Sequence, residues 1–158
     1  MKAFLEIFLL VIVAIVLGVL FIYFTDTLWA PSTIQSPENK VCFSSRCFFV
    51  QLAKTNAERE KGLMNVTKLD KDSGMLFIFD KAGVYPFWMK NTLIPLDMIW
   101  INEKNEVVFI GQNVQPCKNF ICPVVNPKVS AKYVLEINAG ISNEMGLKFG
   151  DKIELKIK

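Results

Sequence analysis

The sequence predicts a mainly β domain of the α+β class, a compact antiparallel β-barrel or sandwich with one or two short helices, preceded by a single N-terminal transmembrane helix. Three observations support this prediction. The chain has 158 residues, enough for one domain and a short appendage. Its apolar residues form one long run near the N-terminus and then about seven or eight short β-like runs. A helical pattern is confined to about two turns among those runs.

The long apolar run covers residues 4–24 and reads FLEIFLLVIVAIVLGVLFIYF, with Glu6 as its only charge. At ~1.5 Å per residue, a helix of this length spans the ~30 Å hydrocarbon core of a bilayer. A buried core helix rarely stays apolar on every face, and a cleaved signal peptide has an apolar region of only ~7–15 residues before small residues. We therefore expect an uncleaved membrane anchor in residues 1–25.

Flanking charges predict the orientation of this anchor. Lys2 precedes the helix and Asp26 follows it, so the positive-inside rule places the N-terminus in the cytoplasm and the domain outside. Residues 26–40 have two prolines and no periodic apolar pattern, and we expect them to form a polar tether. Residues 41–158 form the expected extracytoplasmic domain.

The cysteines form two close pairs, Cys42 with Cys47 and Cys117 with Cys122. An even number of cysteines in a small domain without histidine favours disulfides over reduced thiols or a metal site. A zinc site built from four cysteines usually has two residues between paired ligands, whereas four intervene here. We expect two disulfides, no metal and no cofactor. Disulfides form in an oxidising compartment (or a hyperthermophile cytosol), which agrees with the charge rule.

The first elements of the domain are predicted from β-like runs and a capping signal. Residues 41–45 and 47–53 are expected to pair as a hairpin closed by the first cysteine pair. Thr55 as N-cap and Glu58 three residues later form a capping box, which opens a short helix to about Met64.

The rest of the domain reads mainly as strands. Residues 95–102 are apolar on both faces, which indicates a strand buried on both sides. A polar turn at 103–106 precedes the next strand, and a proline-containing loop carries the second cysteine pair. The remaining expected elements are strands at 74–79, 85–92, 107–114, 131–138 and 152–157, with a helical turn within 140–147.

The domain contains a series of distinctive short motifs. They are Gly62-Leu63-Met64, Gly74-Met75-Leu76-Phe77, Phe87-Trp88-Met89-Lys90-Asn91-Thr92, Pro95-Leu96-Asp97, Pro116-Cys117, Cys122-Pro123, Val134-Leu135-Glu136, Ala139-Gly140 and Gly150-Asp151. Together they resemble the prokaryotic domain-of-unknown-function family 192. The resemblance covers residues 47–157, and the Trp-Met-Lys-Asn-Thr block is its most specific part; the anchor and the Cys42/Cys47 pair lie outside the family core. It implies a compact β-rich domain, often exported or anchored, without an established activity.

The candidate site is the block from Trp88 to Asp97. On a strand, Trp88, Lys90 and Thr92 share one face. Asn91 and Asp97 join Lys90 only if a hairpin forms through residues 93–95. The block would then make a concave polar cluster beside aromatic walls, suited to a small polar or sugar-like ligand. Alternatively, Asn91 and Asp97 bond the turn backbone, Lys90 pairs with Asp97, and Trp88 lies in the core.

Arg59 is a further candidate, because it lies on the short helix before the Gly62-Leu63-Met64 motif. It is either an anion contact or part of a solvated helix face. We expect Leu63, Met64, Met75 and Met89 to fill the core.

Composition narrows the function classes. The net charge is +3 and no Arg/Lys cluster interleaves with aromatics, so a nucleic-acid partner is not expected. The chain has no His and no G-x-S-x-G motif, which gives catalysis little support. We therefore expect a binding or accessory domain for a small ligand or a neighbouring membrane protein.

Two alternatives stay open. The first is an envelope-glycan hydrolase or lyase, with Asp97 as base and Lys90 or Arg59 orienting the substrate. The second is thiol–disulfide exchange at Cys117 and Cys122. Redox catalysts usually have two residues between their cysteines at the start of a helix, so a structural role fits this pair better.

Overall fold

The computed structural model describes residue 15 and residues 39–158. The expected anchor (residues 1–25) and tether (residues 26–40) lie outside the described residues, apart from positions 15, 39 and 40. All the strands belong to one compact unit, Ser36–Lys158. Within the part of the chain that the structure describes, no helix is long and apolar enough to cross a membrane.

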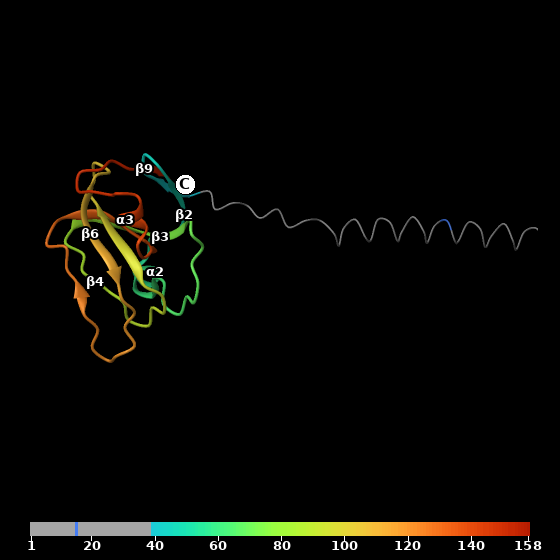
Figure 1. Ribbon diagram of the computed structural model, residues 1–158, viewed down its shortest axis with the longest axis vertical. Coiled ribbons are helices and arrows are strands. Elements are labelled where there is room, and N and C mark those ends of the chain that lie inside the picture. Colours follow the sequence, from blue (N-terminus) through green and yellow to red (C-terminus); the bar gives the residue numbers. More distant parts are fainter. Residues whose placement is uncertain (1–14, 16–38) are drawn as a thin grey trace, which may run out of the picture. The chain divides into compact units, whose positions relative to one another are not determined.

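The domain is built on one seven-stranded sheet with the order β6-β5-β8-β3-β2-β1-β9 (Figure 1). A second sheet pairs only β4 with β7. The strands of the large sheet are β1 (Lys40–Cys42), β2 (Cys47–Ala53), β3 (Ser73–Gly83), β5 (Leu96–Ile101), β6 (Val107–Val114), β8 (Ala131–Asn138) and β9 (Glu154–Lys156); those of the small sheet are β4 (Phe87–Trp88) and β7 (Val124–Val125).

The mainly β class with two short helices is confirmed, but the sheet is neither closed nor wholly antiparallel. β2 and β3 pair in parallel, because helix α2 (Asn56–Lys61) and the segment after it carry the chain across between them. β6 and β9 remain the two edges of the sheet. An isolated bridge, Glu106 with Lys152, links the start of β6 to the chain just before β9.

Helix α2 begins with the expected capping box. Thr55 accepts a hydrogen bond from the backbone N–H of Glu58 at 3.2 Å, and the Glu58 carboxylate accepts one from the Thr55 N–H at 2.8 Å. The helix ends at Gly62, whose φ of 46° belongs to the left-handed region.

The large sheet separates two apolar clusters, because side chains alternate across each strand. On β8, Leu135 and Ile137 join the first cluster, together with the short helix α3 (Ile141–Glu144). Val134 faces the second cluster, which contains Met89 and Cys117. Segments on that second side of the sheet carry most of the predicted site residues.

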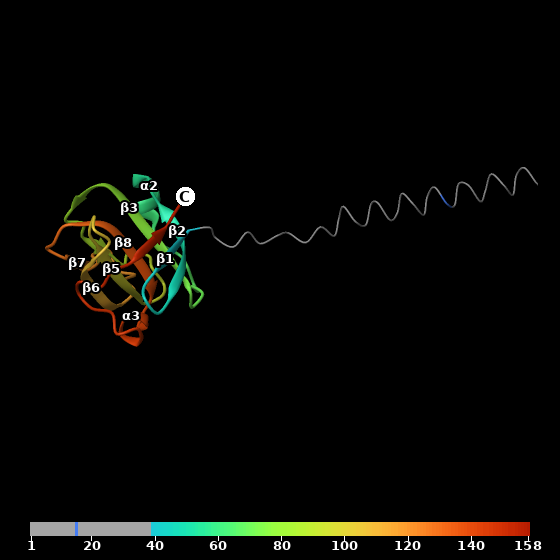
Figure 2. The same ribbon diagram turned by 90° about the horizontal axis from the view of Figure 1, so that it is seen from above.

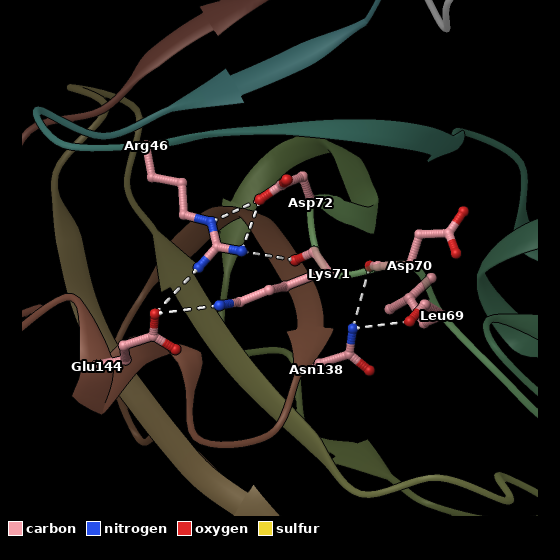
Figure 3. Close-up of polar contacts among 7 residues, drawn as sticks. All are labelled: Arg46, Leu69, Asp70, Lys71, Asp72, Asn138 and Glu144. Carbon is pink, nitrogen blue, oxygen red and sulfur yellow. Dashed lines mark hydrogen bonds and ion pairs between the residues drawn. The ribbon is translucent and has the colours of Figure 1, made fainter.

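Polar contacts fix the turn before β3 against its neighbours (Figure 3). Arg46 donates to Asp72 at 2.7 Å and lies 3.8 Å from Glu144 of α3. The Asn138 amide, at the end of β8, donates to the carbonyl of Leu69 at 3.0 Å. The hairpin, the turn and α3 are thereby tied together beside the two central strands β3 and β8.

Both expected disulfides are present. Cys42 bonds to Cys47 across the β1–β2 hairpin, where the two residues face each other in register. Cys117 bonds to Cys122 and closes the loop that leads into β7. The two pairs have the same sequence separation of 5 but lie in different elements.

Candidate ligand-binding site

The segment that carries the predicted site is more irregular than expected. The sequence predicted a strand over 85–92, but only Phe87 and Trp88 pair as a strand, and they pair with β7. Pro86 lacks a backbone donor before this pair, and Asn91 has a left-handed φ of 55° after it. The hairpin through residues 93–95, which was the condition for Asn91 and Asp97 to join Lys90, does not form: β5 pairs with β6 and β8 instead.

Backbone hydrogen bonds hold residues 89–92 from two sides. On one side, the Cys117 N–H donates to the Met89 carbonyl at 3.2 Å, and the Asn91 N–H donates to the Cys117 carbonyl at 3.1 Å. On the other side, the Asn65 N–H donates to the Asn91 carbonyl at 2.9 Å. The disulfide loop and the segment after α2 thus fix the position of Lys90.

Aromatic packing holds one face of β4 against the core, and Trp88 lies on its other face. The Phe87 ring meets Phe77 and Trp100 edge-on, with centroid separations of 4.8 and 5.5 Å. The Trp100 indole donates to the Tyr85 carbonyl at 2.8 Å. Since neighbouring residues on a strand point to opposite sides, Trp88 faces outward and is 44% exposed. The alternative that Trp88 lies in the core is therefore wrong.

A buried carboxyl group lies beneath this segment. Glu136, on β8, is only 5% exposed. In the register of the sheet it stands between Met75 of β3 and Met98 of β5. The side chains of these two methionines offer only thioether sulfurs, which are weak hydrogen-bond acceptors. Among the described residues, no hydrogen bond or ion pair reaches its carboxyl group. Burial raises the pKa of Glu136 from 4.5 to about 8.

Glu136 opens into a small cavity beside the predicted site residues. The cavity has a volume of about 30 Å³, which accommodates a water molecule or two but not a sugar ring. The residues that line it are Arg59, Glu60, Lys61, Gly62, Leu63, Met64, Phe77, Phe87, Trp88, Lys90, Thr92 and Glu136.

Two larger, more open hollows adjoin the cavity. Their volumes are about 230 and 440 Å³, and both share Glu60 and Trp88 with the cavity. Trp88 is therefore a common wall, and the Lys90 ammonium lies 5.1 Å from its ring centroid. This arrangement suits a ligand that rests outside against Trp88 and inserts one small polar group toward Glu136.

Arg59 lines the cavity, but its guanidinium is engaged within the protein. It donates to the carbonyls of Lys54 and Ile78, the latter at 2.7 Å, and to the Asn56 side chain at 2.5 Å. It also lies 5.1 Å from the Phe79 ring centroid. Arg59 thus holds α2 against β3. This role differs from both hypotheses made from the sequence, an anion contact and a solvated helix face.

Asp97 lies apart from the cavity. It is fully buried on β5, and its two carboxylate oxygens accept from the backbone N–H groups of Asn113 and Ser142, each at 2.8 Å. These charge-assisted bonds join β5 to β6 and to α3. Lys90 does not pair with it. Asp97 therefore holds three elements together at a different place from the other predicted site residues.

The structure thus brings four of the predicted residues to one cavity. Arg59, Trp88, Lys90 and Thr92 line it, and Asn91 lines the larger adjoining hollow. Sequence reasoning missed Glu136 as a site residue. The signal that could have found it is a single carboxylate within the apolar run Val134–Ile137. Burying a carboxylate in an apolar strand lowers stability, so such a residue is a candidate for a functional role.

Comparisons with known proteins match one family model, whose description gives no activity. The family model DUF192, described as "Uncharacterized ACR", matches residues 39–155. No curated protein matches the chain. A protein of unknown function from Novosphingobium aromaticivorans DSM 12444 has a similar solved structure, with 36% identity and a TM-score of 0.67; the match covers 73% of this chain and 82% of that one.

A second similar structure, from Sinorhizobium meliloti 1021, is described provisionally as a transcription regulator. It is 32% identical with a TM-score of 0.67, and the match covers 74% of this chain and 91% of that one. The matched domain thus makes up nearly all of that solved chain. The family match extends over well more than half of the 158 residues, and the chain therefore belongs to the DUF192 family.

Proposed function

We propose that this domain is a binding module for a small polar ligand, which lies against Trp88 and Lys90 and places one polar group on Glu136. The observation that carries the proposal is the carboxyl group of Glu136, which bonds to none of the described residues and lines the cavity. Among the described residues no fully buried side-chain oxygen lacks a partner, so the Glu136 oxygens reach the cavity space, where a ligand or water can bond to them. A carboxyl group with a raised pKa in such a cavity is typical of a functional site. Convergent polar groups beside an aromatic wall are also the usual form of a small-ligand site.

The protonation state of Glu136 narrows the chemistry of the ligand. With a pKa of about 8, the group is mainly a neutral carboxylic acid at pH 7 and can donate a hydrogen bond. Lys90 stands at the rim as a cation. A hydroxyl, carbonyl or carboxylate oxygen on the ligand would satisfy both groups. Sugars and short organic acids carry such oxygens and fit the outer hollows.

The proposal includes the location predicted from the sequence. Residues 4–24 would anchor the chain in a membrane, and the domain would stand outside the cytoplasm. The two disulfides support an oxidising compartment. The ligand would then be an extracellular or envelope molecule, or a group presented by a neighbouring membrane protein.

A second candidate is an enzyme at the same cavity. An envelope-glycan hydrolase or lyase would use Glu136 as its acid. Asp97, which the sequence suggested as the base, does not fit that role because both of its oxygens already bond to backbone. Glu60 lines the cavity as well and would be the second carboxylate that glycoside hydrolysis requires. Cys117 and Cys122 fit thiol–disulfide exchange poorly, since they close a loop rather than begin a helix.

A thermal-shift screen of the fragment 36–158 tests the binding proposal. The probes are monosaccharides, envelope glycans, short carboxylic acids and nucleotides. A ligand at ~100 times its Kd adds about 2.7 kcal/mol to the free energy of unfolding, which such a scan detects. Trp88→Ala and Glu136→Met should each abolish the shift, whereas Glu136→Gln, which keeps a donor and an acceptor, should retain part of it.

Asp97→Asn is the matched control, because it alters a buried carboxylate outside the cavity. It should lower the melting temperature of the free fragment but leave the ligand-induced shift intact. Product analysis then separates the two candidates: Glu136→Gln keeps binding in a binding module and abolishes turnover in an enzyme. The absence of any shift, or a shift that survives both Trp88→Ala and Glu136→Met, would refute the proposed site.

A further inference from the structure

Most of the exposed apolar side chains of the domain lie in one stretch of the chain, which includes the β4–β7 pair and the disulfide loop. Among the described residues, nine large apolar side chains are exposed, and seven of these lie between residues 84 and 129. They include Trp88 at the rim of the cavity and Val124, its partner in the β4–β7 pair. Surface apolar residues scattered singly need no explanation, but a concentration of this kind marks a contact surface.

The disulfide loop carries the most exposed of these side chains. Phe120 is 97% exposed and Ile121 is 84% exposed, at the tip of the loop closed by Cys117 and Cys122. In Figure 1 this loop, in orange, projects from the end of the domain opposite the C-terminus. The disulfide and the backbone bonds of Cys117 hold the base of the loop, so fewer conformations are lost when its tip makes a contact.

Lysines outnumber acidic residues in the chain segments around the disulfide loop. Residues 107–135 contain three lysines and no Asp or Glu, and residues 81–96 contain two lysines and no acidic residue. Of these lysines, Lys132 pairs with Glu103, and Glu60 from α2 stands beside Trp88 in the cavity wall. Asp97, which follows the second stretch, is buried and fully bonded. Lys118 stands in the disulfide loop itself and Lys128 follows β7, and both are exposed.

We propose that this end of the domain docks on the surface of an anionic lipid bilayer, with Phe120 and Ile121 inserted among the headgroups. Apolar side chains at a projecting tip bury themselves at the boundary between headgroups and acyl chains, while nearby lysines attract anionic lipids. Aromatic residues such as Trp88 favour the same interfacial layer. A protein partner would need complementary acidic groups around an apolar pocket, whereas an anionic bilayer offers both features everywhere on its surface.

Docking would also hold the cavity at the membrane surface. Trp88 belongs both to the contact surface and to the cavity wall, so a ligand there would come from the interface. The inference does not depend on the ligand site, since Phe120, Ile121 and Lys118 do not line the cavity. Each proposal can therefore fail without the other.

Tryptophan fluorescence of the fragment 36–158 tests the docking. The fragment holds two tryptophans, of which Trp100 is fully buried and Trp88 is exposed, so a spectral change reports Trp88. We expect a blue shift and co-sedimentation with vesicles of phosphatidylcholine and phosphatidylglycerol at 70:30, but not with phosphatidylcholine alone. The double variant Phe120→Ser/Ile121→Ser should abolish both signals. Phe149→Ser is the matched control, because Phe149 is 76% exposed in another part of the domain, and it should change neither.

The charge contribution is tested separately. Lys118→Gln/Lys128→Gln should weaken vesicle binding by about tenfold or more, because each basic residue near an anionic surface contributes on the order of fivefold. Lys104→Gln, an exposed lysine in the turn between β5 and β6, should have no effect. Equal binding to both vesicles, unchanged binding of the Phe120/Ile121 variant, or no vesicle binding at all would overturn the proposal.

Cross-linking in the full chain distinguishes lipid from protein. Benzoylphenylalanine in place of Phe120 should cross-link to lipid when the chain is in its native membrane. A cross-link to one protein instead of lipid would show that the surface is a protein interface and would overturn the lipid proposal.

Discussion

Glu136 is an ionisable residue in an apolar environment. It stands in a row with two methionines on adjacent strands, where an apolar residue would pack without loss. Its carboxyl group is neutral at pH 7 because ionisation at this depth is unfavourable, and burial raises its pKa to about 8. A protein that keeps such a group accepts lower stability at neutral pH, which agrees with a role in binding.

This pKa predicts how stability depends on pH. Below pH 4.5 both the folded and the unfolded chain hold the proton; between about 4.5 and 8 only the folded chain does. The unfolded state then binds fewer protons, so the free energy of unfolding falls by about 1.4 kcal/mol per pH unit as pH rises through this range. The total loss from this group is on the order of 5 kcal/mol. Urea denaturation of the fragment 36–158 at pH 5, 6, 7 and 8 measures it.

Glu136→Gln removes the titration and gives the comparison. The variant should match or slightly trail the wild type at pH 5 and exceed it by several kcal/mol at pH 8, where the wild-type carboxylate is charged. Glu103→Gln, on the exposed turn after β5, serves as the control and should leave the wild-type pH dependence unchanged. Parallel pH profiles for wild type and Glu136→Gln would mean that Glu136 titrates normally.

At the residue scale, Trp88, Lys90 and Thr92 were expected to share one face of a strand. The strand is limited to Phe87 and Trp88, yet all three residues line the cavity; their role in binding stays a prediction. Asp97 was grouped with them because it is near in sequence, but strand pairing carries it elsewhere. Glu136 was missed for the opposite reason: it lies far along the chain, and only the pairing of β8 with β3 and β5 brings it beneath Trp88.

At the scale of elements, the two disulfides join cysteines with the same sequence separation but lie in different parts of the fold, one in the β1–β2 hairpin and one in the loop before β7. Both close loops of the same length, so each should contribute about 2 kcal/mol in the chain-entropy model. We therefore expect Cys42→Ala/Cys47→Ala and Cys117→Ala/Cys122→Ala to lower the free energy of unfolding by similar amounts in urea denaturation.

Only the second pair should affect the site. Cys117 holds Met89 and Asn91 through its backbone, so releasing its loop loosens the segment that carries Trp88. Iodide quenching of Trp88 in the fragment 36–158 should therefore increase in Cys117→Ala/Cys122→Ala and stay at the wild-type value in Cys42→Ala/Cys47→Ala. An equal change in both variants would assign the effect to general destabilisation.

The elements that local signals specify were predicted well. The capping box at Thr55, the hairpin at residues 40–53 and the buried strand β5 are all present. β4 is much shorter than its apolar run suggested, because Pro86 and the left-handed Asn91 interrupt the ladder. The parallel pairing of β2 with β3 has no local signal, since it depends on where the chain returns after α2.

At the scale of the whole molecule, the central strands are paired over many residues and the outer strands over few. β8 pairs along its length with β3 and β5, whereas β9 has three residues and pairs with β1 alone. β4 and β7 pair over two residues each. A closed barrel, which the run of strands suggested, would have no such outer strands, and closure could not be inferred from strand number alone.

Hydrogen exchange should reproduce this gradient. We expect the amides of β3, β5 and β8 to exchange most slowly, and those of β4, β7 and β9 to exchange faster by local opening. Mass spectrometry of peptides from the fragment 36–158 measures the rates. Protection of β4 equal to that of β8 would contradict the expectation and would make the cavity wall as rigid as the core.

The row of Met75, Glu136 and Met98 also has a consequence for laboratory evolution. If position 136 is randomised and the library is selected for resistance to proteolysis at pH 8, apolar residues should replace the glutamate, because they complete the row at no electrostatic cost. Selection in the native cell should restore it if the carboxyl group serves the organism. The two selections would then choose different residues at the same position, and their disagreement would measure how much function this one side chain carries.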